Sequence, residues 1–258
     1  MIVNKIIGEQ AMSDIPKIFT AEYYDQKYFA DPVGKTFLRP NGTVEKWGYR
    51  NPNGELLASR LIVEAWKKIF APKTMLDVGA GRGTFVAYAR DADIEAYGFD
   101  FSEFAVNEGR YPHCKQEWLQ VHNATKPWPY PDNSFDFIIA LDLLEHIYLD
   151  DLPFVISELY RVAKKWIFLQ IAVAGSGGLQ GREEEGYVLK KGEPVPIQLE
   201  GCAVAGHVTL RKEAWWYEKL EHDDWLPRRD MVNWFVSLVH PDNIKNWLLN
   251  TMIVLEKM

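Results

Sequence analysis

Between residues 74 and 173, short apolar runs alternate with segments of helical periodicity, and this alternation restricts the fold more than any other feature of the chain. It predicts βαβ units, in which parallel strands are joined by right-handed helical crossovers. We therefore expect an α/β domain with a mostly parallel sheet and helices on both faces. The expected strands are 74–78, 94–100, 118–121, 135–141 and 166–173, and the expected helices are 84–90, 102–108 (with Ser102 as its N-cap) and 150–162.

Residues 1–73 precede this core and mix aromatic residues with turn formers. They predict a short helix, an irregular loop and a second helix over 55–70, which together form an N-terminal helical cap or lid. The apolar face of the second helix is expected to carry Leu57, Leu61, Ile62, Ala65, Trp66 and Ile69.

The remainder of the core, which we place at 74–258, is interrupted after the fifth strand. Residues 175–206 are rich in glycine, proline and glutamate, and they predict an inserted substrate loop. Thr209 is then expected to cap a helix over 210–220, followed by a helix over 230–239 and a final strand over 252–255.

The first expected strand runs into a glycine-rich turn, residues 79–83, and then into a helix. Glycines permit positive φ angles and a close approach of the backbone to a ligand. Asp77 lies just before the turn, where its carboxylate would repel a pyrophosphate but attract a cofactor that carries an ammonium group and a sulfonium. Asp100 ends the next strand, where this fold places the acceptor for the ribose hydroxyls. These charges favour S-adenosylmethionine over a nicotinamide dinucleotide.

Three ordered stretches resemble the class I S-adenosylmethionine-dependent methyltransferases, in particular the small-molecule group, over residues 74–173. Residues 76–83 are similar to the first motif of that family, 99–102 to the acidic end of its second strand, and 128–147 to its fourth strand. The resemblance implies a Rossmann-like, seven-stranded sheet. It also implies S-adenosylmethionine as the cofactor and S-adenosylhomocysteine as the product.

The resemblance further implies the cofactor contacts. The glycine turn lines the methionine end, Asp100 holds the ribose, Phe101 covers the adenine and Leu141 lies near the sulfonium. Asn123 stands where the family often has an aspartate near the adenine amino group, and it is either a substitute acceptor or a plain turn residue. The full expected set is Asp77, Gly79, Ala80, Gly81, Gly83, Asp100, Phe101, Ser102, Asn123, Ala124 and Leu141.

Two histidines are candidates for the catalytic base that some methyl acceptors require. His146 lies just past the fourth strand and His207 follows the inserted loop, and for each the alternative is packing or helix capping. Asp142 or Glu145 is expected to orient His146 or to contact the substrate. No metal ligand is expected.

Three tyrosines in the N-terminal segment, Tyr23, Tyr24 and Tyr28, are expected to close over the cofactor as an aromatic lid. The alternative is an amphipathic helix docked on the core.

The net charge and the motifs of the chain narrow the class of methyl acceptor that we expect. The chain has 258 residues and a formal net charge of −7, whereas nucleic-acid binding begins with a basic face. Residues 141–144 also lack the Asn- or Asp-Pro-Pro-aromatic sequence of exocyclic-amine methyltransferases. We therefore expect methylation of oxygen or nitrogen on a small molecule. An RNA or protein methyltransferase, and a non-catalytic module that binds S-adenosylmethionine, are the alternatives.

The two cysteines, Cys114 and Cys202, form no CxxC pair, and the chain shows neither a signal peptide nor a run of about 18 apolar residues. These features predict a cytoplasmic protein with no membrane contact and no disulfide, and they are compatible with a homo-oligomer.

Overall fold

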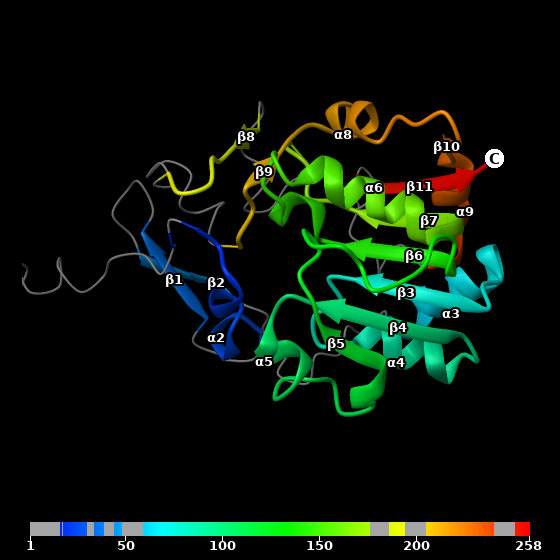
Figure 1. Cartoon of the computed structure of the whole chain (residues 1–258), viewed down its shortest axis with the longest axis horizontal. Helices are drawn as coiled ribbons and strands as arrows, with labels where there is room; N and C mark the ends of the chain where they lie inside the picture. The colour runs from blue at the N-terminus through cyan, green and yellow to red at the C-terminus, as the bar shows by residue number, and fades with distance from the viewer. Residues whose placement is uncertain are drawn as a thin grey trace, which may run out of the picture.

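The computed structural model describes residues 16, 18–29, 34–38, 44–47, 59–175, 186–193, 205–239 and 251–258. Its centre is a seven-stranded sheet with the strand order β10-β11-β7-β6-β3-β4-β5 (Figure 1). Strand β11 pairs antiparallel with β7 and with β10, and the neighbouring pairs from β7 to β5 are all parallel. The sheet strands are β3 (Thr74–Val78), β4 (Glu95–Asp100), β5 (Leu119–Val121), β6 (Phe135–Leu141), β7 (Ala163–Gln170), β10 (Trp225–Pro227) and β11 (Met252–Lys257). The predicted Rossmann-like, mostly parallel sheet is therefore confirmed.

Successive strand residues alternate between two hydrophobic layers, because side chains of a strand point to opposite faces. Met75 and Phe137 pack on one face with helices α3 (Ser59–Phe70), α4 (Thr84–Asp91) and α9 (Arg229–Leu238). Leu76 and Ile138 pack on the other face with α6 (Leu152–Val162) and α8 (Glu213–Lys219). The helices thus cover both faces, as predicted (Figure 1).

Most expected elements of the core lie within a few residues of the observed ones. Helix α5 (Glu103–Val106) begins after Ser102, whose Oγ accepts a hydrogen bond from the Ala105 N–H at 3.0 Å, which confirms the predicted N-cap. Strand β7 begins three residues earlier than expected, because the chain passes directly from α6 into the strand at Ala163. It also ends earlier, since the backbone of Ala172 leaves the sheet to bind a side chain.

The prediction of an irregular loop between the first two helices is wrong. After the short helices η1 (Ala21–Tyr23) and α2 (Gln26–Phe29), strands β1 (Lys35–Leu38) and β2 (Val44–Trp47) form an antiparallel hairpin. Both strands contain β-branched and aromatic residues, which favour strands. The described residues of the N-terminal segment therefore include both helices and strands.

Helix α3 buries the predicted apolar face except at Leu61: Ala65 and Trp66 are buried, and Ile62 and Ile69 pack against the core. Its buried residues include Val63, Trp66 and Phe70, whereas Leu61 is 47% exposed. Trp66 is 1% exposed and packs against Phe85, Phe137, Phe168 and Phe235, so the face is centred on this residue and Leu61 falls at its margin. Leu57 lies outside the described residues.

Thr209 does not cap a helix. It lies in strand β9 (Thr209–Leu210), which pairs antiparallel with β8 (Tyr187–Val188), and its Oγ1 donates to the Ile147 carbonyl at 2.8 Å. Helix α8 begins later, after Lys212. Strand β8 belongs to the predicted insertion, of which residues 176–185 and 194–204 lie outside the described part of the chain. Within the described ranges, no helix has the length and apolarity needed to span a membrane.

Candidate active site

The predicted site residues gather at the carboxyl-terminal edge of strands β3, β4 and β6. Figure 1 shows these strands pointing toward the N-terminal elements and toward β8 and β9, which lie beyond that edge. Loops at this edge of a parallel sheet form the ligand site of doubly wound folds. The arrangement is therefore built from the β3–α4 turn, the β4–α5 junction, the segment after β6, and a covering layer from two other parts of the chain.

The glycine turn follows β3 and adopts left-handed backbone conformations, with φ of +76° at Gly79, +52° at Gly81 and +77° at Gly83. Residues that carry a side chain rarely adopt these φ angles, which explains why glycine occupies all three positions. A Cβ on Gly83 would lie 2.6 Å from the sulfur of buried Cys114, and one on Gly79 would lie 2.9 Å from a Leu143 methyl carbon. A Cβ on Gly81 would meet only Phe29, at 3.5 Å, so this glycine has an open face that suits a ligand.

Asp100 joins the glycine turn to the end of β4. Its two carboxylate oxygens accept hydrogen bonds from the Gly81 N–H at 2.8 Å and the Ser102 N–H at 2.7 Å. Burial raises the pKa of Asp100, while these backbone donors act in the opposite direction. Each oxygen keeps a further lone pair, so Asp100 can accept bonds from a ribose.

Asp77 lies behind the turn and is 2% exposed. Burial, together with the nearby negative charge of Asp100, raises the pKa of Asp77 to about 8. A buried carboxylate in this position gains stability from any cation that binds beside it. Its position therefore fits a ligand that carries an ammonium or sulfonium group, which would favour the ionised form of Asp77.

Three further residues of the predicted cofactor set follow strands β4 and β5. The side-chain oxygen of Asn123 accepts bonds from the Thr125 N–H and hydroxyl, both at 2.9 Å, which is the geometry of the turn alternative. Ala124 is buried and its carbonyl accepts a bond from the Trp128 indole at 2.9 Å. Phe101 lies at the β4 edge, with its ring centroid 6.3 Å from that of Tyr24.

The segment after β6 carries the other predicted residues. Leu141 ends β6, and Asp142 follows with an unusual positive φ of +50° and a carboxylate that accepts a bond from Gln170 at 3.2 Å. Strained non-glycine residues of this kind cluster at functional sites. The short helix η3 (Leu144–His146) then brings Glu145 and His146 to the sheet edge.

His146 and His207, far apart in sequence, lie side by side. Their ring centroids are 4.8 Å apart and nearly perpendicular. Burial lowers the pKa of His146 to about 4, and burial with the neighbouring His146 lowers that of His207 well below its usual value. Both imidazoles are therefore neutral at pH 7. Glu145, His146 and His207 also form a group whose possible metal-ligating atoms all lie within 4.8 Å of one another.

A covering layer, which we call the roof, consists of residues 21–29 and 205–208. The Tyr28 hydroxyl donates to the Ala205 carbonyl at 2.9 Å and so joins the two halves. Tyr24 spans the site: its backbone carbonyl accepts a bond from the Ser102 hydroxyl, and its own hydroxyl lies 3.3 Å from Nδ1 of His146. Tyr23 is buried among the roof aromatics, with its ring centroid 4.9 Å from that of Phe19.

Sequence reasoning did not single out three residues that shape the site. Leu143 packs on Gly79, Gln170 binds Asp142, and Gly206 allows the roof to approach, since a Cβ there would lie 2.5 Å from the Tyr24 hydroxyl oxygen and 3.0 Å from His146 Nδ1. The glycine directly before His207 is the one signal in the sequence that indicates a close approach.

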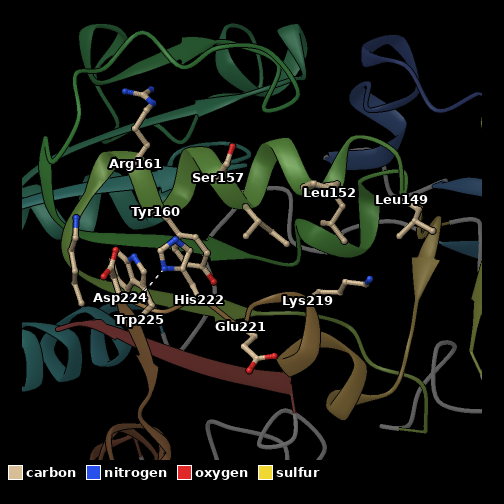
Figure 2. A pocket seen from close by; sticks show the side chains of 13 residues that line it. Leu149, Leu152, Ser157, Tyr160, Arg161, Lys219, Glu221, His222, Asp224 and Trp225 are labelled. Atoms are coloured by element: carbon tan, nitrogen blue, oxygen red, sulfur yellow. Dashed lines mark hydrogen bonds between the residues drawn. The ribbon is translucent and has the colours of Figure 1, made fainter.

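A separate groove of about 530 Å³ runs between α6 and the residues around β10 (Figure 2). Its lining includes Tyr160, His222 and Trp225, and the Tyr160 and His222 rings lie 4.8 Å apart. None of the predicted site residues lines it. The candidate active site is therefore the carboxyl-terminal edge of the sheet and not this groove.

Comparison with known protein families identifies the family that the residues of this edge match. Residues 76–166, which include the glycine turn, Asp100 and η3, match the family described as "Methyltransferase domain". This part of the chain is an S-adenosylmethionine-dependent methyltransferase domain. Such a domain binds S-adenosylmethionine, and the residues at the sheet edge fit this cofactor through the open face of Gly81 and the acidic side chain of Asp77.

Two plantazolicin methyltransferases of known structure share the fold of this chain. The plantazolicin methyltransferase BamL, solved with a triazolic desmethylPZN analog and SAH, is 14% identical, with 78% of this chain and 85% of that chain aligned at a TM-score of 0.52. BpumL, solved with a pentazolic analog and SAH, is 14% identical over 80% and 86% of the two chains, also at 0.52. PH0226 from Pyrococcus horikoshii OT3 is 24% identical over 45% of this chain, and the match spans 59% of that protein at a TM-score of 0.39.

Proposed function

We propose that the methyltransferase transfers the methyl group of S-adenosylmethionine to an oxygen or nitrogen atom of a small-molecule acceptor. The observation that carries this proposal is the roof, which covers the edge of the sheet from Ser102 to His146 through the single residue Tyr24. A covered site excludes water and admits acceptors of limited size. BamL and BpumL, whose folds are similar, are named as methyltransferases of plantazolicin.

In the proposed arrangement the cofactor and the acceptor occupy the two ends of the covered edge. The glycine turn and Asp77 surround the methionine end of the cofactor, Asp100 and Ser102 bind the ribose side, and Phe101 with Ala124 or Asn123 borders the adenine. The bound cofactor supplies a methyl group activated by positively charged sulfur. Leu141 lies beside it, and the roof tyrosines Tyr23, Tyr24 and Tyr28 hold the acceptor in line.

The proposed acceptor side consists of polar groups after β6 and in the roof. His146 and His207 lie beside the reacting oxygen or nitrogen, and Asp142 and Glu145 orient the acceptor or the histidines. Substrate specificity then depends on the roof and on the inserted loop at 175–206, because loops at this edge vary independently of the core.

An acceptor screen tests the proposal directly. Release of S-adenosylhomocysteine is measured with hydroxyl- and amine-bearing small molecules, and separately with RNA and with protein. We expect release with one class of small molecule. Release with RNA or protein alone would contradict the proposal, and binding of S-adenosylmethionine without release in any mixture would favour a non-catalytic module.

The His146→Ala variant tests the acceptor side. We expect the rate of methyl transfer to fall by about 10- to 100-fold, because a group beside the reacting atoms is lost, while the affinity for S-adenosylmethionine stays unchanged. Calorimetric titration measures the affinity, and product release measures the rate. His222→Ala, in the separate groove, is the matched control. An unchanged rate in His146→Ala would remove this residue from the proposed set.

From the raised pKa of Asp77 we expect cofactor binding to release a proton. Its pKa of about 8 leaves the carboxyl group mostly protonated at pH 7, and a nearby ammonium or sulfonium favours the ionised form. The affinity for S-adenosylmethionine should therefore rise between pH 6 and pH 7.5, by up to about tenfold per pH unit.

Calorimetry in two buffers with different ionisation enthalpies detects this proton. The observed binding enthalpy should differ between the buffers for the unmodified chain, and the difference should vanish in Asp77→Asn. Equal enthalpies in both buffers for the unmodified chain would show that Asp77 does not ionise when the cofactor binds.

A further inference from the structure

Glu145, His146 and His207 converge on the acceptor side although they come from two separate segments. Glu145 and His146 are consecutive in η3, and His207 lies in the roof. The Val208 N–H donates to the Glu145 carbonyl at 2.8 Å, which holds the two segments together. As a result, one oxygen and two imidazole nitrogens lie within 4.8 Å of one another.

Two polar atoms of this group are buried without a partner in the described part of the chain. Glu145 is fully buried; its Oε1 accepts a bond from the Ala172 N–H at 2.9 Å, but its Oε2 has no hydrogen bond. His207 is 4% exposed and its Nδ1 also has none. Leaving such atoms unsatisfied in the interior is costly, because each has lost its hydrogen bonds to water. Folded proteins rarely leave such atoms without a partner unless a further group binds there.

We propose that Glu145, His146 and His207 bind one divalent transition-metal ion, and that this ion holds a hydroxyl oxygen of the acceptor. Two imidazoles and one carboxylate are the ligands of many catalytic zinc sites, and imidazole favours such metals over magnesium or calcium. Ligand atoms at about 2.1 Å from a tetrahedral ion lie about 3.4 Å apart. The three side chains therefore need to close by at most about 1.4 Å, which small rotations supply.

The surroundings leave the ion one accessible side. His146 is half-buried and Asp142 is exposed, so the group opens toward the proposed acceptor position. Burial, with the nearby charge of Asp142, raises the pKa of Glu145 well above its usual value, and no cation pairs with Glu145 among the described residues. A bound cation compensates this buried carboxylate. A neutral imidazole has one nitrogen with a lone pair, which is the form that binds a metal ion.

This inference rests on the proposed function and makes the acceptor more specific: a molecule whose hydroxyl group reaches the ion. A metal ion lowers the pKa of an oxygen that it binds. The acceptor hydroxyl then releases its proton to solvent, and its oxygen lone pair forms the new O–CH₃ bond as the S–CH₃ bond breaks and its electron pair returns to sulfur. The histidines thereby act on the acceptor through the ion. They need not accept the proton themselves, which suits two imidazoles whose lowered pKa makes them poor bases.

Titration of the chelator-treated protein with Co²⁺ tests the site, because the visible absorption of Co²⁺ reports its coordination geometry. We expect one equivalent to bind with a tetrahedral or five-coordinate spectrum, and Zn²⁺ to displace it. Glu145→Gln keeps the acceptor for the Ala172 N–H but removes the charge, and it should weaken Co²⁺ binding at least about tenfold. His207→Ala should do the same. His222→Ala, a histidine outside the group, should bind Co²⁺ like the unmodified chain.

Two results would overturn the inference: no Co²⁺ binding by the unmodified chain, or equal binding by Glu145→Gln and His207→Ala in protein that retains its affinity for S-adenosylmethionine. The same samples separate the metal site from the proposed function. Methylation of a hydroxyl acceptor without Co²⁺ binding leaves the function and refutes the metal. Co²⁺ binding that both variants weaken, without methylation of any small molecule, supports the metal site and refutes the function.

Discussion

Gly81→Val is expected to abolish S-adenosylmethionine binding while leaving the chain folded. The new side chain would fill the open face of the glycine turn, where only Phe29 approaches, at 3.5 Å. It would also strain a backbone with φ of +52°, which costs about 1 to 3 kcal/mol at a branched residue. We expect the dissociation constant to rise at least about 100-fold, equivalent to about 2.8 kcal/mol, as measured by calorimetry.

Gly192→Val is the matched control for that experiment. Gly192 also has a positive φ, +84°, and its nearest potential contact is an Ile18 methyl group at 3.9 Å. The control therefore carries similar backbone strain outside the glycine turn, and it should bind the cofactor normally. Retained binding by Gly81→Val, or equal loss in both variants, would contradict the role proposed for the turn.

Asp100→Ala is expected to weaken cofactor binding by about 100- to 1000-fold. Hydrogen bonds to a charged group contribute about 1.5 to 3 kcal/mol each, and we propose that this carboxylate accepts bonds from two ribose hydroxyls. The substitution also removes the acceptor for the Gly81 and Ser102 N–H groups, which loosens the glycine turn. Asp100→Asn keeps one acceptor oxygen, so its cofactor affinity should lie between those of Asp100→Ala and the unmodified chain.

Asp136→Ala provides a control that loses the same type of bond elsewhere. Asp136 accepts hydrogen bonds from the Lys73 and Thr74 N–H groups, at 2.9 and 3.0 Å, at the start of β3 and so at the opposite end of the sheet. It should lower the thermal stability without changing the cofactor affinity. An affinity of Asp100→Ala within about threefold of this control would exclude the ribose contact.

Local sequence signals predicted the core strands well because each strand end is marked. Strand β3 has its predicted bounds, since the apolar run stops at the glycine turn, and β6 does too, since Ser134 precedes it and strained Asp142 follows it. The Ser102 cap is equally local, because its hydroxyl binds a backbone N–H three residues away. Features that depend on neighbours in sequence were therefore predictable.

Elements that are stabilised by partners far away in the sequence could not be predicted in this way. Strand β10 contains a proline and pairs at the sheet edge with β11, which lies about thirty residues further along the chain. Thr209 resembles a helix cap in sequence, but its hydroxyl binds the carbonyl of Ile147, 62 residues away. In both cases a long-range contact determines the local structure, and no short pattern encodes it.

The candidate site shows the same division. The glycine turn and Asp100 follow predicted strands, so the fold class alone brings them to one edge. His146 and His207 could each be named as candidates, but their juxtaposition requires the roof to fold across the sheet, with Gly206 passing against Tyr24. The metal group could not be predicted because its third member comes from that distant segment.

Tyr24 has a thermodynamic consequence for the two proposed ligands. Its carbonyl is bound by Ser102, beside the proposed ribose contact, and its hydroxyl is bound by His146, beside the proposed acceptor position. If one ligand orders this residue, the other binds to a partner that has already lost that freedom. The resulting coupling free energy is reciprocal. The factor by which the acceptor raises the affinity for S-adenosylmethionine equals the factor by which S-adenosylmethionine raises the affinity for the acceptor.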